Sequence, residues 1–334
     1  MLTFISNLVR WDTWYDSKIP FFLMCIFYAA LDYHLHAFSL IVEMVVLLLL
    51  FCLYASLGHI VNSYSDRVID HLAGKPNILA QLPDKIAREL VFLVIMADLL
   101  ITFLFYYDES AVLVLFYLAI TIAALYSLPP IRLKERGILG LVAAAIAQRT
   151  LPVVIIFQAL DAWGLSALLL CVLATLIGMR YIIIHQIKDE KADLRTQVQT
   201  VATTKGVFFL QRLLRQIIFP LELVTLIITL FVISTDFYLL GVLVVIYALW
   251  SGLQLLVLDT NKETRFSIES YTILADLYYL YWPLLFSALL IERDSLFWLV
   301  LGFTVIWLLR RLRREVVQVW QVIIVFREKI NFSN

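Results

Sequence analysis

The chain has 334 residues, of which 63% are hydrophobic and only 16% are charged, and its mean hydropathy is +0.92. Because a soluble core does not need so much apolar surface, this composition excludes an ordinary soluble domain and indicates an integral membrane protein. Basic and acidic residues are balanced at 26 each, which gives no support to nucleic-acid binding. The three cysteines lie inside apolar runs without CxxC spacing, so neither a disulfide framework nor a zinc site is indicated.

The chain begins with residues 1–19, whose Trp11, Trp14 and Tyr15 predict a segment at the membrane interface rather than a cleaved signal peptide. Apolar runs of the length that a bilayer-spanning helix needs then recur. They lie near residues 20–35, 38–62, 87–106, 110–127, 138–160, 164–187, 213–233, 237–258, 270–291 and 295–312. The sequence therefore predicts an all-α, polytopic membrane bundle with ten spans.

Lysine and arginine fall almost entirely on one set of loops, which the positive-inside rule assigns to the cytoplasm. The opposite set contains only Arg293. An even number of spans also places residues 310–334, which open with RRLRR, inside as a basic tail. Since no linker divides the chain, residues 1–334 are expected to form a single integral-membrane domain. We expect it in the cytoplasmic membrane of a bacterium, with its functional side facing the cytoplasm.

Two polar trios stand at the ends of long apolar runs. Asn62, Asp66 and Asp70 are spaced four by four, and so are His185, Asp189 and Asp193. Residues four apart line up on one face of a helix, and both trios are expected on the same side of the membrane. Carboxylates arranged in this way suit Mg²⁺, which favours carboxylates together with substrate phosphates. The predicted metal ligands and catalytic carboxylates are Asp66, Asp70, Asp189 and Asp193. Any one of these aspartates, taken alone, is better explained as a solvated helix end, and it is the duplicated spacing that favours a site.

The loop between the trios, YSLPPIRLKERG, runs from Tyr126 to Gly137. Its two prolines must end the preceding helix, so Arg132 and Lys134 lie in a loop on the cytoplasmic side. We predict that these two side chains clamp phosphate oxygens as part of the catalytic machinery. A topological anchor that only obeys the positive-inside rule is the alternative.

Arg149 lies well inside the fifth apolar run, where an ionisable residue is a functional hypothesis by default. The alternative is a structural pair with an acid in another span. The candidate acids are Glu43, Asp98 and Asp276. Arg180 precedes Asp189 by nine residues, so it points to the opposite side of that helix and is not expected in the same site. The predicted substrate contacts include Asn62, His185, Arg149 and Lys188.

The first trio, the YSLPPIRLKERG loop and the second trio, in this order, resemble the UbiA superfamily of intramembrane prenyltransferases over about residues 20–205. The resemblance implies a bundle, usually of nine spans, around a central cavity. It also implies that the aspartates bind an isoprenyl diphosphate through Mg²⁺, and it adds Tyr126 and Ser127 to the substrate contacts. The chain departs from the family pattern at Ser63, where an aspartate is usual, at His185, where some members have another acid, and at Gln197, where a glycine is common.

The leading hypothesis is Mg²⁺-dependent transfer of an isoprenyl group from its diphosphate to a lipophilic acceptor in the membrane, with an aromatic acceptor favoured. Breaking the allylic C–O bond leaves negative charge on the diphosphate, which cations stabilise, and positive charge on the prenyl chain, which aromatic faces stabilise. A membrane terpene cyclase of the same family would share this ionisation but consume no acceptor. A cation-coupled transporter is the alternative from a different class. The chain is also expected to contact membrane lipid, and it is not expected to bind nucleic acid.

Overall fold

The structure of the protein is a computed structural model, which describes the chain except residues 1, 73, 236, 259–270, 272 and 332–334. Within the described residues every regular element is a helix, which confirms the predicted all-α class. The α-helices are α1 (Leu2–Val9), α2 (Trp11–Trp14), α3 (Ile19–Asp32), α4 (Ala37–Ser65), α5 (Arg67–Leu72), α6 (Asp84–Tyr106), α7 (Ser110–Ser127), α8 (Ile138–Ala145), α9 (Leu151–Ala159), α10 (Leu165–Arg195), α11 (Val201–Lys205), α12 (Val207–Leu213), α13 (Phe219–Ser234), α14 (Tyr238–Leu258), α15 (Trp282–Leu290), α16 (Phe297–Trp307) and α17 (Leu309–Asn331). Short 3₁₀ turns are η1 (Ile78–Gln81) and η2 (Leu133–Glu135), and π-helical turns are η3 (Ile146–Thr150), η4 (Leu214–Ile218) and η7 (Leu277–Tyr281).

Ten apolar helices in the described part of the chain correspond in order to the ten predicted runs. Six stretches are long and apolar enough to cross a membrane: 37–65, 84–106, 110–127, 138–159, 165–195 and 207–234. Four shorter apolar helices cover 19–32, 238–254, 277–290 and 297–307. With 11 residues, α16 is about 16 Å long, whereas the hydrocarbon core of a bilayer is about 30 Å thick. An integral membrane protein is confirmed, and the choice between nine and ten spans stays a prediction.

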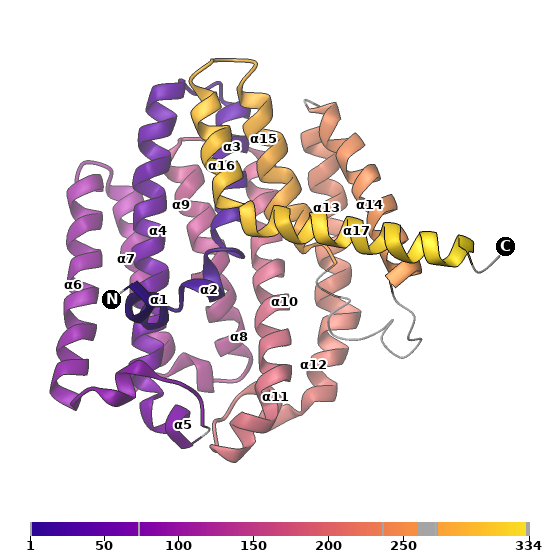
Figure 1. Cartoon of the computed structure of the whole chain (residues 1–334). Coiled ribbons are helices and arrows are strands. Elements are labelled where there is room, and N and C mark those ends of the chain that lie inside the picture. The colour runs from indigo at the N-terminus through magenta and orange to yellow at the C-terminus, as the bar shows by residue number, and fades with distance from the viewer. Residues whose placement is uncertain (1, 73, 236, 259–270, 272, 332–334) are drawn as a thin grey trace.

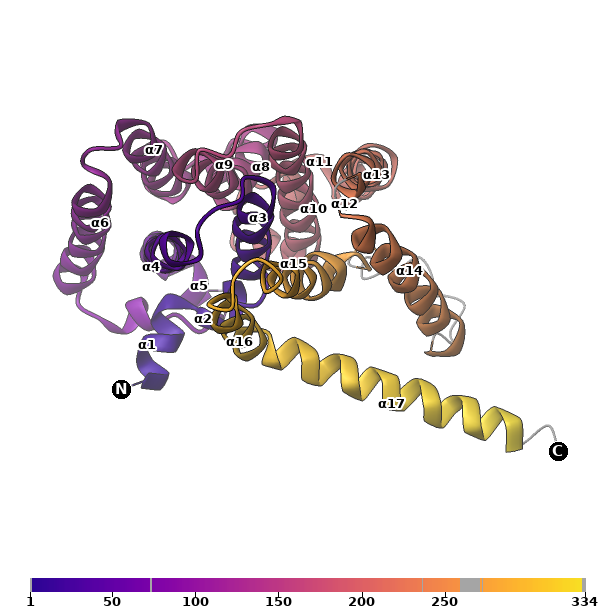
Figure 2. The same ribbon diagram turned by 90° about the horizontal axis from the view of Figure 1, so that it is seen from above.

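The long helices stand roughly parallel to one another, with α3 inside the group when the bundle is viewed from above (Figures 1 and 2). Every residue of α3 from 19 to 31 is buried, and the helix packs against α4, α9 and α15. A helix that is hydrophobic all round is expected in such a position, because no face of it gains from contact with water. The central cavity that the resemblance implies stays a prediction.

Three spans contain a π-helical turn shortly before a proline. The turns η3, η4 and η7 are followed by Pro152, Pro220 and Pro283, each two residues after the turn ends. A proline has no backbone N–H and its ring clashes with the preceding turn, so the helix widens there by one residue per turn. These turns carry Arg149 and Tyr279, and the widening therefore sets the direction of two polar side chains inside the bundle.

The two ends of the chain lie against each other. After Leu308 the chain turns, and α17 runs across the bundle rather than along it (Figure 1). Three arginines at its beginning bind aspartates that precede α3. The pairs are Arg310 with Asp12 at 3.1 Å, Arg311 with Asp16 at 2.7 Å and Arg314 with Asp16 at 2.9 Å. The segment expected as a basic tail is thus helical through residue 331, and it is joined to the N-terminal segment.

Candidate functional site

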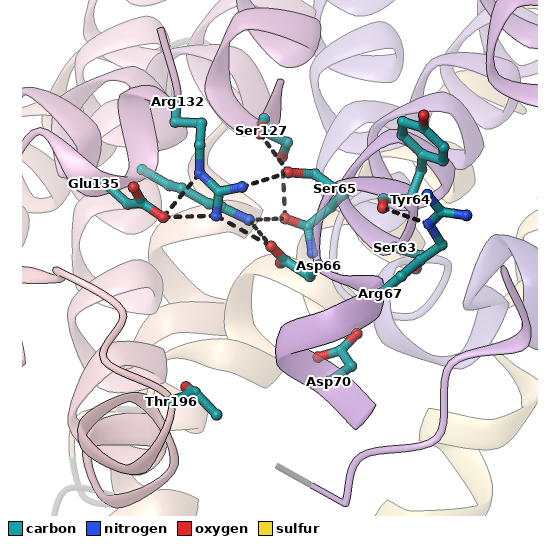
Figure 3. A network of polar contacts seen from close by, with 12 residues as sticks. Ser63, Tyr64, Ser65, Asp66, Arg67, Asp70, Ser127, Arg132, Glu135 and Thr196 are labelled. Atoms are coloured by element: carbon teal, nitrogen blue, oxygen red, sulfur yellow. Dashed lines mark hydrogen bonds and ion pairs between the residues drawn. The ribbon is translucent and has the colours of Figure 1, made fainter. Parts of the chain in front are cut away.

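The first aspartate motif stands where α4 gives way to α5. Asp66 follows the last residue of α4, and its Oδ1 accepts hydrogen bonds from Lys134 Nζ at 2.5 Å and from Arg132 Nη2 at 3.5 Å. One turn earlier, Asn62 Oδ1 accepts hydrogen bonds from Ser127 Oγ at 3.0 Å and from Lys134 Nζ at 3.2 Å. Figure 3 shows Arg132 and Asp66 facing each other beside Ser127. The predicted motif and the predicted basic loop therefore meet.

The backbone of the loop fixes the direction of Lys134. Arg132 adopts a left-handed conformation with φ of 42°, and the short η2 turn then carries Lys134 inward. A Cβ atom at Gly140 would lie 2.4 Å from the carbonyl oxygen of Leu133, so only glycine lets α8 pack this close to the loop. Burial lowers the pKa of Lys134, and the Asp66 carboxylate opposes this shift. The result is a buried cation held beside the first motif.

Asp70 is the more enclosed end of the first motif. Its carboxylate accepts a hydrogen bond from Asn77 Nδ2 at 2.8 Å and lies 3.6 Å from Arg10 Nη2 of the N-terminal segment. The same Asn77 amide also donates to the carbonyl oxygen of Ser63, the position where the family usually has an aspartate. Burial raises the pKa of Asp70, and the hydrogen bond from Asn77 opposes that rise.

The second motif stands at the end of α10 and is more open. Asp189 Oδ2 lies 3.0 Å from Lys75 Nζ and 3.8 Å from His185 Nε2. Side-chain exposure is 31% for Asp189 and 68% for His185. Since Lys75 follows α5, its contact with Asp189 directly joins the segment after the first motif to the second motif. The chain reverses after α10, where the backbone N–H of Val198 donates to the carbonyl oxygen of Asp193 at 3.0 Å.

Two other predicted substrate contacts lie in different environments. Tyr126, at the end of α7, is near enough to Asp66 and Asp193 for electrostatic interaction with both. Lys188 is exposed, one residue before Asp189 and therefore about 100° round the helix from it. Tyr126 thus lies between the motifs, whereas Lys188 stands at the rim.

Arg149 is 3% exposed and makes no ion pair with a described residue. Its Nη1 donates to the carbonyl oxygen of Ser17 at 2.7 Å, and its guanidinium lies 5.4 Å from the ring centre of Tyr181 and 5.3 Å from that of Tyr279. The structural pairing considered as the alternative is not formed with any of the three candidate acids. Tyr106 donates to Glu43, Arg311 binds Asp276, and Asp98 has no hydrogen-bond partner among the described residues.

Arg180 points away from the second motif, as the helical periodicity predicts. Both Arg180 and Glu222 of α13 are fully buried, and they form two hydrogen bonds, of 2.7 and 3.0 Å. Two parallel bonds of this kind are the strongest form of arginine–carboxylate pair. The pair joins α10 to α13 on the side of α10 opposite Asp189, so it positions the second motif without entering it.

The side chains of both motifs offer the kind of ligands that Mg²⁺ requires. Carboxylate and amide oxygens predominate, and hard cations prefer oxygen ligands. Among the described residues, no three histidine, cysteine, aspartate or glutamate side chains are close enough together to hold a metal by themselves. Lys134, Arg132 and Lys75 neutralise the carboxylates instead. The residues therefore fit a cation that is bound together with a substrate phosphate rather than by protein ligands alone.

Several residues of the site could not be found from the spacing of motifs. Arg10, between α1 and α2, and Asn77, just before η1, reach Asp70 from outside α4 and α5, and neither belongs to a periodic pattern. Glu135 binds Arg132 at 2.6 Å and so limits the charge of the loop. The position of Lys75 after the first motif is the one signal that the sequence offers, because a basic residue followed by proline fits the family pattern there.

The UbiA prenyltransferase family model matches residues 19–273, which include both aspartate motifs and the loop between them. No curated protein matches the chain. Among solved structures, a UbiA homolog from Archaeoglobus fulgidus bound to GPP and Mg²⁺ is 12% identical with a TM-score of 0.56, covering 84% of this chain and 98% of that chain. The same homolog bound to DMAPP and Mg²⁺ gives the same values.

A further structure concerns digeranylgeranylglyceryl phosphate synthase in membranes. It is 14% identical with a TM-score of 0.53, and the match covers 84% of this chain and 96% of that chain. Likenesses at such low identity show a common fold. The family model covers most of the chain, and this chain therefore belongs to the UbiA prenyltransferase family.

Proposed function

We propose that this protein transfers an isoprenyl group from an isoprenyl diphosphate to a lipophilic acceptor within the membrane, with an aromatic acceptor favoured. The observation that carries the proposal is the contact of 3.0 Å between Lys75 and Asp189. Through this contact the segment that follows the first motif reaches the second motif, which supports a site formed by both. Cations from two loops, Lys75 and the Arg132–Lys134 pair, lie beside them.

The diphosphate would occupy the space between the two motifs. Lys134, Arg132 and Lys75 now pair with carboxylates, and each can turn to a phosphate oxygen when a substrate arrives. Mg²⁺, held by Asp66, Asp70, Asp189 and Asp193 and supported by Asn62, would supply positive charge to the departing diphosphate. Asn77 and Arg10 keep the Asp70 side chain in place during this exchange. These residues stabilise the charge that develops as the C–O bond breaks.

The prenyl group would extend from the motifs into the apolar part of the bundle. Tyr181 and Tyr279 present their rings there, with Arg149 beside both. Aromatic faces attract a carbocation electrostatically, and burial excludes the water that would react with it. Tyr126 and Ser127 lie at the end of α7 between the motifs and are proposed substrate contacts, as are His185 and Lys188 at the rim.

The same proposal assigns the site to the cytoplasmic side of a bacterial cytoplasmic membrane. The ends of α4 and α10 lie on the same side of the bundle as the start of α3, because an even number of helices separates these points. Loops on this side carry almost all of the lysine and arginine, and such loops remain in the cytoplasm.

The test is an assay of the purified full chain in nanodiscs. Radiolabelled geranyl, farnesyl and geranylgeranyl diphosphates are supplied with a panel of phenolic and quinol acceptors, in Mg²⁺ or EDTA. Asp66→Asn and Asp189→Asn remove one carboxylate from each motif. Asp108→Asn is the matched control, because Asp108 is exposed in the loop between α6 and α7 on the opposite side.

Transfer requires diphosphate release that depends on Mg²⁺ and on both motifs, with label appearing in an acceptor. If the label appears in a cyclic hydrocarbon and no acceptor is consumed, the protein is a terpene cyclase rather than a transferase. If folded protein releases no diphosphate from any substrate, the proposal is wrong, and cation uptake into liposomes becomes the measurement to make.

A further inference from the structure

The last helix, α17, has no role in the function proposed above. It covers Leu309–Asn331, beyond the residues 19–273 that the family model matches. Figure 2 shows it leaving α16 and extending away from the bundle. Toward the bundle it contacts α14, through hydrogen bonds of 3.3 Å from Trp250 to Glu315 and of 3.0 Å from Gln254 to Gln318. Because α17 is attached to the protein along only one side, its other side must contact water, lipid or another molecule.

The exposed side of α17 is apolar, and part of it, formed by Val316, Val319 and Trp320, borders a cavity of about 330 Å³ between α17 and α14. Arg311 and Val322 are buried, and these residues face the protein. The exposed apolar side chains are Leu309, Val316, Val317, Val319, Trp320, Ile323 and Ile324. At 100° per residue they occupy one continuous face of the helix. Because several of them are more than half exposed, water is an unfavourable surrounding for this face.

A basic groove runs along the border of the same face. It has a volume of about 620 Å³ and is lined by Leu309, Arg310, Arg313, Arg314, Val317 and Gln318. Four of the five residues from 310 to 314 are arginines. Arg313 makes no ion pair with a described residue. Arg310 pairs with Asp12 and Arg314 pairs with Asp16, and both arginine side chains remain more than half exposed. Guanidinium groups beside apolar side chains match a ligand with an anionic head and an acyl chain.

We propose that α17 lies in the headgroup region of the membrane and binds anionic phospholipid through Arg310, Arg313 and Arg314. The apolar face of the helix enters the acyl boundary. Arg310 and Arg314 contact lipid phosphates at the border of this face, and Arg313, which lies within the face near the start of the helix, extends its guanidinium to the same headgroup level. An acidic protein would match the arginines but not the apolar face, which extends from Leu309 to Ile324. The direction of α17, across the membrane-spanning helices, is that of a helix lying in the interface (Figure 1).

The first measurement is the depth of Trp320. The full chain is placed in nanodiscs of phosphatidylcholine mixed with phosphatidylglycerol, with and without bromine on the acyl chains, and Trp320→Phe is compared with the wild type. The difference between the two proteins reports the fluorescence of Trp320 among the eight tryptophans. Brominated lipid should quench this difference signal. An unquenched signal would place the face in water and overturn the proposal.

The second measurement is lipid retention by native mass spectrometry. Each arginine near an anionic surface contributes about fivefold to affinity, so Arg313→Gln should reduce retained phosphatidylglycerol about fivefold and the triple Arg310→Gln/Arg313→Gln/Arg314→Gln variant about 100-fold. High salt should reduce retention by the wild type in the same direction. The control variant, Lys85→Gln/Arg88→Gln/Arg212→Gln, removes three exposed basic residues elsewhere and should retain most of the lipid.

Equal retention by the wild type and the triple variant would overturn the proposal. Retention of an acidic protein by α17 in place of lipid would overturn it as well. Neither Trp320 quenching nor lipid retention depends on catalysis, so both test the lipid proposal independently of prenyl transfer. Arg313→Gln removes no ion pair of the fold among described residues, so a loss of lipid in this variant cannot be attributed to misfolding of the N-terminal segment.

Discussion

The first aspartate motif is held more firmly than the second. Asp66 is 15% exposed and bound by Lys134 and Arg132, and Asp70 is 11% exposed and bound by Asn77 and Arg10. Asp189 is 31% exposed, and its closest partner is Lys75, which is itself 40% exposed. Folding therefore fixes one half of the site in advance. The other half can change partners at little cost, because pairs of exposed charges contribute only about 0–1 kcal/mol.

What holds the second motif is the packing of α10 and not its own contacts. The fully buried pair of Arg180 and Glu222 joins α10 to α13. We expect the largest effect from Arg180→Met, because it leaves the Glu222 carboxylate buried without its partner. Loss of one member of such a pair destabilises a protein by about 3–5 kcal/mol. Thermal unfolding in nanodiscs measures this loss, and diphosphate release should fall with it.

A double variant shows whether the instability of Arg180→Met comes from an unpaired charge or from lost packing. Arg180→Met together with Glu222→Leu removes both charges and leaves apolar volume, which often restores stability. An unfolding temperature of Arg180→Met equal to that of the wild type would show that the pair does not anchor α10.

Next in size are the two aspartates themselves. Asp66→Asn and Asp189→Asn should each reduce diphosphate release by about 100-fold or more, because each removes a charge needed in the transition state. Only Asp66→Asn should also lower stability, by about 1–3 kcal/mol, since it leaves the nearly buried Lys134 without its carboxylate. Paired measurements of activity and unfolding temperature test this. Equal losses of stability in the two variants would contradict the difference between the motifs.

A smaller effect is expected from Lys75, the residue that joins the two halves. Lys75→Met should reduce diphosphate release about tenfold, while stability changes by less than about 1 kcal/mol because both partners are partly exposed. Lys85→Met is the matched control, since Lys85 is 79% exposed and contacts only Glu89 among the described residues. Unchanged activity in Lys75→Met would mean that the contact with Asp189 has no role in binding the diphosphate.

The sequence predicts those parts of the site that depend on periodicity along one helix. Asn62 and Asp66 share a face because they are four apart, and Arg180 points away from Asp189 because it is nine before it. The ten apolar runs likewise correspond to helices, since length and hydropathy are local properties.

Contacts between distant segments follow no such local pattern. Arg149 illustrates this, because three membrane acids are plausible partners on charge alone. The fold gives it instead the backbone carbonyl of Ser17 and two tyrosine rings. Arg10 reaches Asp70 across about 60 residues of chain, and the packing of α1 on α4 brings them together. The dense arginines of residues 310–314 predict a basic tail, whereas the structure shows a helix from Leu309 to Asn331.

A further prediction concerns the pH dependence of stability and depends on Lys18, at the start of α3. Burial and the nearby Arg149 lower the pKa of Lys18 from 10.5 to about 7, and His59 of α4 also faces it. Below pH 7 this lysine is protonated in both the folded and the unfolded chain. Between about pH 7 and 10.5 the unfolded chain binds more protons, so the free energy of unfolding rises with pH in this window.

One titrating group changes the free energy of unfolding by at most about 1.4 kcal/mol per pH unit, and the measured slope should lie below that limit. Unfolding temperatures in nanodiscs at pH 7, 8 and 9 give the slope. Lys18→Met removes the titrating group and should flatten the curve above pH 7, whereas Lys85→Met, at an exposed position, should leave it unchanged. Stability that falls as pH rises from 7 to 9 in the wild type, or an equal slope in Lys18→Met, would show that Lys18 stays charged when the protein is folded. Lys18 would then add a permanent positive charge beside Arg149.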